Sequence, residues 1–180
     1  SDGAYSQGIN ITGSVLALNS IEENGRIYLK SDSINISGDL KSQNILIENG
    51  SKNIQINGTL TSNQLSIKSD SILYQTGILN SNEVNINTTK LINGGEINAE
   101  TVFIHTDGPY IETSQSTISS TKIINLQSNT SLFSSGKLYN PGGDILILSP
   151  TITLVSAEIN TSGNNAGRIF IGGGAHGENI

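Results

Sequence analysis

A short sequence phrase recurs along this chain with a nearly constant period. Two aliphatic residues flank one other residue, and these triplets begin every 18 to 20 positions through the first hundred residues. They start at Ile9, Ile27, Ile45, Leu65, Val84 and Val102, and the row continues at Ile123 or Ile124, Ile145 and Ile169. Such alternation is typical of a strand with one buried face, and a fixed period indicates stacked structural repeats.

Two further rows of aliphatic residues lie between the triplets. The second row comprises Ile34, Ile54, Ile72, Leu91, Ile111, Leu132 and Ile152. The third row comprises Leu40, Leu60, Leu79, Ile97, Ile118, Leu138 and Ile159. Each repeat therefore holds three short strands, which are too small to bury an apolar face unless the repeats stack. We predict an all-β, right-handed parallel β-helix of about nine coils of 18–24 residues, which forms one segment over residues 1–180 of a longer secreted protein.

A small residue stands two positions before the third-row aliphatic residue in most repeats. Gly38, Gly58, Gly77 and Gly95 each stand two positions before a third-row aliphatic residue, and Ser116 and Ala157 take the same place later. A corner between two strands either requires a positive φ or leaves no room for a side chain, and glycine suits both cases. The residues in this column are therefore expected to form one corner of every coil.

The composition agrees with many short strands and turns. The chain contains 28 Ile, 25 Ser and 22 Asn residues, and Ile favours strands whereas Ser and Asn favour turns. An antiparallel β-sandwich would share these features. A sandwich does not require a constant repeat length, so the period favours the β-helix.

Charge and hydropathy exclude several classes of partner. The formal net charge is −6 and the chain lacks a basic stripe, so we do not expect nucleic acid as a partner. No apolar run approaches the roughly 18 residues of a membrane span. Cysteine is absent, which excludes disulfide stapling but leaves the cellular compartment open.

Three stretches carry a resemblance to a known family. These are "GDLKSQNILIENG" at 38–50, "GGDILILSPTITLVSAEINTSG" at 142–163 and "GRIFIGGGAHG" at 167–177. Over Ile9 to Gly177 the pattern resembles the filamentous haemagglutinin family, the exoproteins of bacterial two-partner secretion. The resemblance implies a secreted or cell-surface adhesin that acts in attachment or contact with other cells. It also implies two kinds of partner: an outer-membrane transporter during secretion, and a receptor or glycan on a host or neighbouring cell.

The chain offers no clear catalytic, cofactor or metal site. Polysaccharide lyases and hydrolases with a β-helix fold need clustered carboxylates, and the fifteen acidic residues here are scattered along the sequence. His105 and Asp107 lie two apart and face one way, but no nucleophile accompanies them, so a polar turn is expected. His176 is the only other histidine, which argues against a metal site. We expect a protein that is not an enzyme, and the alternative is a carbohydrate-active enzyme with a β-helix fold. An ice-binding protein is disfavoured because its binding face needs a regular row of threonines, and the outward residues here are too mixed.

Two features define a candidate binding surface. The outward positions of the triplets include Phe103, Leu146 and Phe170, with Leu146 and Phe170 expected one coil apart. Exposed apolar side chains in such a row indicate either a covering segment or a bound partner. The second feature is the corner after the third strand, which lengthens from five residues at 97→102 to ten at 159→169 and contains Asn160, Asn164 and Asn165. An insertion in a stacked rod leaves as a loop, and such a loop is either functional or a tolerated insertion.

Overall fold

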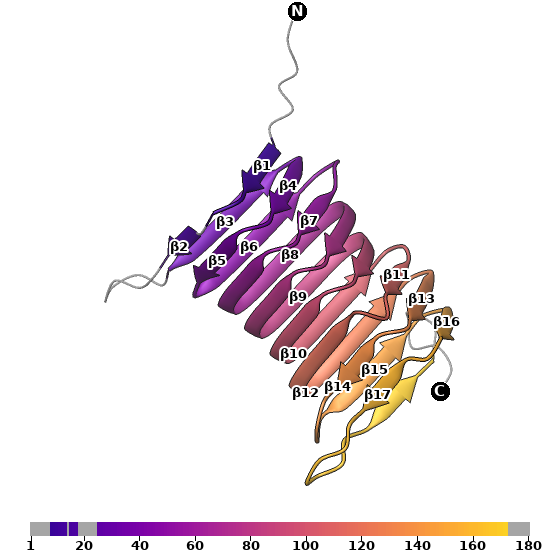
Figure 1. The fold of residues 1–180 in the computed structure, drawn as a ribbon. Coiled ribbons are helices and arrows are strands. Elements are labelled where there is room, and N and C mark those ends of the chain that lie inside the picture. Colours follow the sequence, from indigo (N-terminus) through magenta and orange to yellow (C-terminus); the bar gives the residue numbers. More distant parts are fainter. Residues whose placement is uncertain (1–7, 14, 18–24, 173–180) are drawn as a thin grey trace, which may run out of the picture.

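The computed structural model describes residues 8–13, 15–17 and 25–172, and all regular structure among them is β. The strands form one continuous sheet in which every pairing is parallel. Figure 1 shows these strands stacked along one axis, from indigo strands at one end to yellow strands at the other. The chain is therefore a β-solenoid, as the period predicts. The described residues contain no helix that could cross a membrane.

Each coil contributes one strand to each of three faces. The first face contains β3 (Arg26–Ser31), β6 (Asn44–Asn49), residues 64–69 of β8 (Thr59–Gln75), 83–88 of β9 (Ile78–Asn93), 101–106 of β10 (Glu96–Thr106), 123–128 of β12 (Thr117–Ser128), β15 (Asp144–Leu148) and β18 (Ile169–Ile171). The second face contains β1 (Gly8–Ile11), β4 (Ser33–Ile36), β7 (Ile54–Ile56), the ends of β8 and β9, β11 (Tyr110–Glu112), β13 (Ser131–Ser134) and β16 (Thr151–Leu154). The third face contains β2 (Val15–Ala17), β5 (Asp39–Ser42), the starts of β8, β9, β10 and β12, β14 (Lys137–Tyr139) and β17 (Glu158–Asn160).

The described strands make about seven turns, with eight strands on each face. The expected nine coils counted Ile9 as the first member of the Ile27 row, and this placement is wrong. Ile9 pairs with Ile34, so it belongs to the second face. That step covers 25 residues, whereas the later steps on the first face cover 18 to 24. Ile9 and Ile27 therefore lie on different faces, and their spacing of 18 residues matches the coil period by coincidence.

Two members of the expected second row are also wrong. The inward residues are Leu73 and Tyr110, which have exposed fractions of 0% and 1%. The expected Ile72 and Ile111 are their neighbours and do not belong to the buried core. The register between β8 and β9 shifts between Ser69 and Ile72, where β8 carries one extra residue. Inward and outward positions alternate without a break in β8 from Leu65 to Leu73, so the extra residue lies opposite a corner of β9 in which Thr88 and Leu91, three residues apart, both point inward. In the first row, Ile124 is the buried residue of the two candidates.

The glycine column exists because coils approach one another closely there. A Cβ added to Gly38, Gly58, Gly77 or Gly95 would lie only 1.8 to 2.2 Å from the carbonyl oxygen of the glycine one coil earlier. Positive φ angles are confined to Ser156, Gly142 and Gly172 among the described residues. Lack of space, and not backbone conformation, therefore selects glycine in these four coils.

Small polar side chains line the inside of the corners, which the sequence analysis did not predict. The corner after the first-face strands buries Asn49, Ser69, Thr88, Thr106, Ser128 and Ser149. Ser128 Oγ donates hydrogen bonds to the carbonyl oxygens of Gly108 and Ser131 at 2.8 and 2.9 Å. Thr88 Oγ1 donates to Ser71 O at 2.7 Å. These hydroxyl groups satisfy carbonyl groups that the turning chain withdraws from the strand ladders.

One buried carboxylate lies at the second corner. Glu112 is fully buried; Ser116 Oγ donates to its Oε1 atom at 2.8 Å, and Ser134 Oγ donates to its Oε2 atom. Asn93 Nδ2 donates to Ser116 Oγ at 2.8 Å, which extends the network by one coil. Burial raises the pKa of Glu112, although the serine hydroxyl groups act in the opposite direction. Ser116, which takes the place of glycine in this coil, therefore fixes the side chain of the buried Glu112.

Candidate functional site

The outward residues of the first face form a continuous row along the rod. In order, this row contains Tyr28, Leu46, Ser66, Asn85, Phe103, Asn125, Leu146 and Phe170. Leu146 and Phe170 lie one coil apart, and Phe103 lies two coils before Leu146, as predicted. A second outward row runs beside it through Lys30, Glu48, Lys68, Asn87, His105 and Gln127.

A groove of about 440 Å³ lies between these two rows, and we call it the Phe103 groove. Its outward side chains are Ser66, Asn85, Phe103 and Asn125 on one side and Lys68, Asn87, His105 and Gln127 on the other. Ile67, Ile86 and Ile104 stand between the rows, so strand backbone forms the floor. Four consecutive coils contribute to the groove, which therefore follows the rod axis.

The groove presents one aromatic ring among amide groups. Phe103 keeps 37% of its surface exposed, and its neighbours in register one coil before and one coil after are Asn85 and Asn125. Asn85 Nδ2 donates to Glu83 Oε1 at 2.6 Å, which fixes one side of that amide. Asn125 Oδ1 is buried and has no hydrogen-bond partner among the described residues. Amides offer both donors and acceptors, so this row can bind hydroxyl groups.

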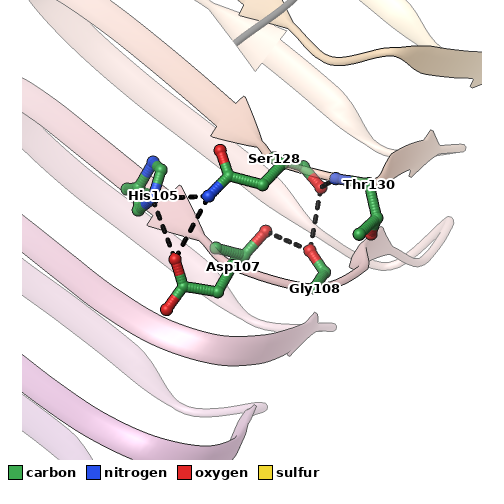
Figure 2. A network of polar contacts seen from close by, with 7 residues as sticks. His105, Asp107, Gly108, Ser128 and Thr130 are labelled. Atoms are coloured by element: carbon green, nitrogen blue, oxygen red, sulfur yellow. Dashed lines mark hydrogen bonds and ion pairs between the residues drawn. The ribbon is translucent and has the colours of Figure 1, made fainter.

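His105, which lines one side of the groove, lies close to Asp107 (Figure 2). His105 Nε2 lies 3.4 Å from Asp107 Oδ1, and Asn129 Nδ2 donates to that same oxygen at 3.2 Å. The nearby Ser128 hydroxyl donates to backbone carbonyl groups and not to the histidine. The cluster is therefore a polar turn, as expected, with no nucleophile aligned on the histidine among the described residues. His176 lies outside the described residues.

The six residues of the expected binding surface do not form one site. Leu146 and Phe170 lie on the first face beyond the Phe103 groove, and Leu146 is partly buried. Arg168 stacks 5.4 Å from the centroid of the Phe170 ring while its guanidinium binds Asp144 at 2.6 Å. One face of the Phe170 ring is therefore already occupied by a neighbouring side chain.

Asn160 ends β17, and Asn164 and Asn165 lie in the corner between β17 and β18. Asn164 and Asn165 are exposed in a loop, whereas the side chain of Asn160 accepts hydrogen bonds from the backbone and hydroxyl group of Ser162 at 2.8 and 2.6 Å. The extra residues leave as a loop without disturbing the pairing of Ile145 with Ile169. This loop is a separate surface from the Phe103 groove.

A second groove gathers acidic residues that appear scattered in the sequence. Asp32, Glu48 and Asp70 line a groove of about 630 Å³ with Lys30 and Lys68. Stacking of the coils brings these residues together, and the spacings of 18 and 20 between Lys30, Glu48 and Lys68 could have identified the groove. The Tyr28 hydroxyl donates to Glu48 at 2.6 Å and lowers the pKa of Glu48. A general acid needs a raised pKa, so Glu48 is not prepared for that role.

The described residues contain no cluster of His, Cys, Asp or Glu suited to a metal ion. Comparison of the chain with models of protein families, with characterised proteins and with solved structures gives no match.

Proposed function

We propose that this chain is a rod segment of a secreted or surface-exposed bacterial adhesin or exoprotein of the two-partner secretion type. In this role the rod holds binding residues at a distance from the cell that carries it. Its partners are an outer-membrane transporter during secretion and a receptor or glycan on a host or neighbouring cell.

The observation that carries the proposal is a continuous aliphatic core beneath outward rows of varied chemistry. Inward residues form the core from Ile27 to Ile147, while the outward rows vary freely among amide, hydroxyl, aromatic and charged side chains. A stacked fold of this kind can change its surface without changing its core. That separation suits a protein whose task is to present side chains.

Secretion in an extended state is consistent with the same architecture. Coils contact mainly their sequence neighbours, so folding can begin in one coil and spread along the rod. The chain has no cysteine and therefore needs no disulfide formation after export. The repeat phrases that resemble filamentous haemagglutinin support the same interpretation.

A carbohydrate-active enzyme is the second candidate, and the groove around Glu48 favours it. Three carboxylates and two lysines from neighbouring coils line that groove. Cleavage of an acidic polysaccharide by the purified chain, with loss of cleavage in Glu48→Gln, would support the enzyme. The lowered pKa of Glu48 is the reason to rank it second.

Attachment of cells to protein-coated beads tests the leading proposal. We expect beads coated with the whole chain to bind bacterial or epithelial cells, and soluble chain to compete for that binding. Beads coated with an unfolded core variant, Ile86→Asp, provide the control. If neither cell type attaches more strongly to the folded chain than to this control, the adhesin proposal is wrong.

A further inference from the structure

We propose that the Phe103 groove binds a neutral, extended oligosaccharide whose chain lies along the rod axis. This inference names the ligand class for the binding face of the proposed function and so rests on that proposal. It follows from the dimensions of the groove, its hydrogen-bonding groups and its charge.

The dimensions fit a narrow chain. The groove spans four coils, and three intercoil steps of about 4.8 Å give a length of about 14 Å. Its two rows are separated by two residues of a strand, or about 7 Å. In an extended β-1,4-linked chain, the repeat per sugar is close to the coil spacing. About three sugar units would therefore meet equivalent positions on successive coils.

The side chains match the two surfaces of a sugar ring. A pyranose has an apolar face of C–H groups that stacks on aromatic rings, and hydroxyl groups around its edge that donate and accept hydrogen bonds. Phe103 supplies the ring, and Asn85 and Asn125 flank it one coil away on either side. The Asn125 Oδ1 atom is buried and unpaired, and it becomes an acceptor for a sugar hydroxyl group when the amide turns toward the groove. Asn87 and Gln127 offer further amides from the opposite row.

Charge excludes an acidic ligand. Lys68 is the one lysine or arginine that lines the Phe103 groove, and it stands in register with Glu48 of the preceding coil. An anionic polysaccharide or nucleic acid would need a cluster of basic residues, which the described groove lacks. A neutral ligand needs none.

The pairing pattern excludes addition of a peptide strand at this place. The first-face segments of β8, β9, β10 and β12 each pair on both sides with neighbouring coils. Their backbone donors and acceptors are therefore used within the rod, whereas strand addition requires a free edge. Recognition in this groove must depend on side chains.

Calorimetric titration of the whole chain with defined tetrasaccharides tests the inference. We expect cellotetraose or chitotetraose to bind, maltotetraose to bind more weakly because its chain curves, and affinity to stay constant between about 0.05 and 0.5 M NaCl. Phe103→Ala should weaken binding at least about tenfold, the equivalent of about 1.4 kcal/mol. The matched control is Phe133→Ala on the second face, because Phe133 is 36% exposed and Phe103 is 37% exposed. The control should change affinity less than about twofold. Both variants should melt within a few degrees of the parent, since each removes an outward side chain.

Three results of the titration would overturn the inference. The first is no binding of cellotetraose or chitotetraose at millimolar concentration. The second is equal weakening by Phe103→Ala and Phe133→Ala. The third is binding of a sulfated oligosaccharide in preference to the neutral ones. Bead attachment separates the two proposals: if cells attach equally to the parent and to Phe103→Ala, the groove assignment fails while the adhesin proposal stands.

Discussion

The glycine column offers a sharp test of the stacking geometry, because adjacent glycines differ in their surroundings. An added Cβ on Gly95 would lie 2.2 Å from Gly77 O and 2.5 Å from Gln75 Oε1. On Gly94 the nearest atom would be Thr113 Oγ1 at 3.1 Å, which a small side-chain rotation can relieve. Neither glycine has a positive φ. Gly94→Ala is therefore a matched control for Gly95→Ala.

The expected destabilisation follows from these distances. The coil must move by more than about 1 Å before the new Cβ and Gly77 O reach van der Waals contact. Overpacking of this kind costs about 3 kcal/mol at the upper end of its usual range. The movement also stretches the bond from Glu96 N to Gly77 O, now 2.9 Å long, which adds about 1 kcal/mol. Loss of unfolded-state entropy offsets about 0.7 kcal/mol, so Gly95→Ala should destabilise the rod by about 3 kcal/mol.

Thermal unfolding followed by far-ultraviolet circular dichroism measures this effect. For a chain of 180 residues, 3 kcal/mol corresponds to a Tm lower by about 6 to 12 °C. Gly94→Ala should melt within about 2 °C of the parent, because its entropic gain and its mild contact nearly cancel. Equal melting temperatures for the two variants would refute the argument that close approach of the coils selects glycine.

Three further predictions concern the core, a buried acid and the long corner. Ile86→Asp should abolish the β-sheet circular dichroism signal, since Ile86 is 3% exposed and an unpaired charge there lacks solvation. Asn87→Asp serves as the control, because Asn87 is exposed and lies in register with Lys68, and a folded Ile86→Asp protein would contradict the register. Because burial raises the pKa of Glu112 above its unfolded value, its stabilising contribution is fully present below the unfolded pKa and declines as pH rises through the folded pKa. Urea midpoints should therefore decline with rising pH in the parent more than in Glu112→Gln, and parallel pH profiles would disprove this origin. Deleting residues 162–166, all of them exposed, shortens the 159→169 step to the five residues of 97→102 and should leave Tm within about 3 °C; a larger loss would show that the loop stabilises the last coil.

The sequence period predicts the solenoid and most of its core because the spacing of inward residues is set by the coil geometry. It fails where an aliphatic residue can occupy either side of a strand. Ile72 and Leu73 are equally apolar, and the alternation that starts at Leu65 continues to Leu73, which is therefore the inward residue. The buried hydroxyl groups were missed because serine and threonine are usually exposed in turns. Their constant position supplies a signal that could have identified them: Thr88 and Thr106 each follow an inward isoleucine by two residues.

The candidate site is less accessible to sequence reasoning than the core. The period places Phe103 outward, but its flanking amides depend on the register at Asn125. That register changes by one residue where β12 carries an extra residue opposite Ala99 and Thr101. The hydrogen bonds of His105 and Asn129 likewise join residues from different coils. Contacts of this kind depend on the register between neighbouring coils, and the local sequence pattern does not determine that register.

Charge on the rod surface is arranged so that opposite signs meet on successive coils. Glu48 lies in register between Lys30 and Lys68, and Asp144 pairs with Arg168 at 2.6 Å. Exposed ion pairs of this kind add little stability, roughly 0 to 1 kcal/mol each. In a parallel stack, however, residues at the same position of successive coils lie about 4.8 Å apart, so like charges there would repel one another in every coil. Alternating charge signs avoid this repulsion, whose total free energy would increase with the length of the rod. Along the Phe103 groove the surface carries one lysine and otherwise presents a hydroxyl group, amides, an imidazole and one phenyl ring. A partner that binds such a surface must be recognised by shape and hydrogen bonding, which is why its affinity should change little with salt.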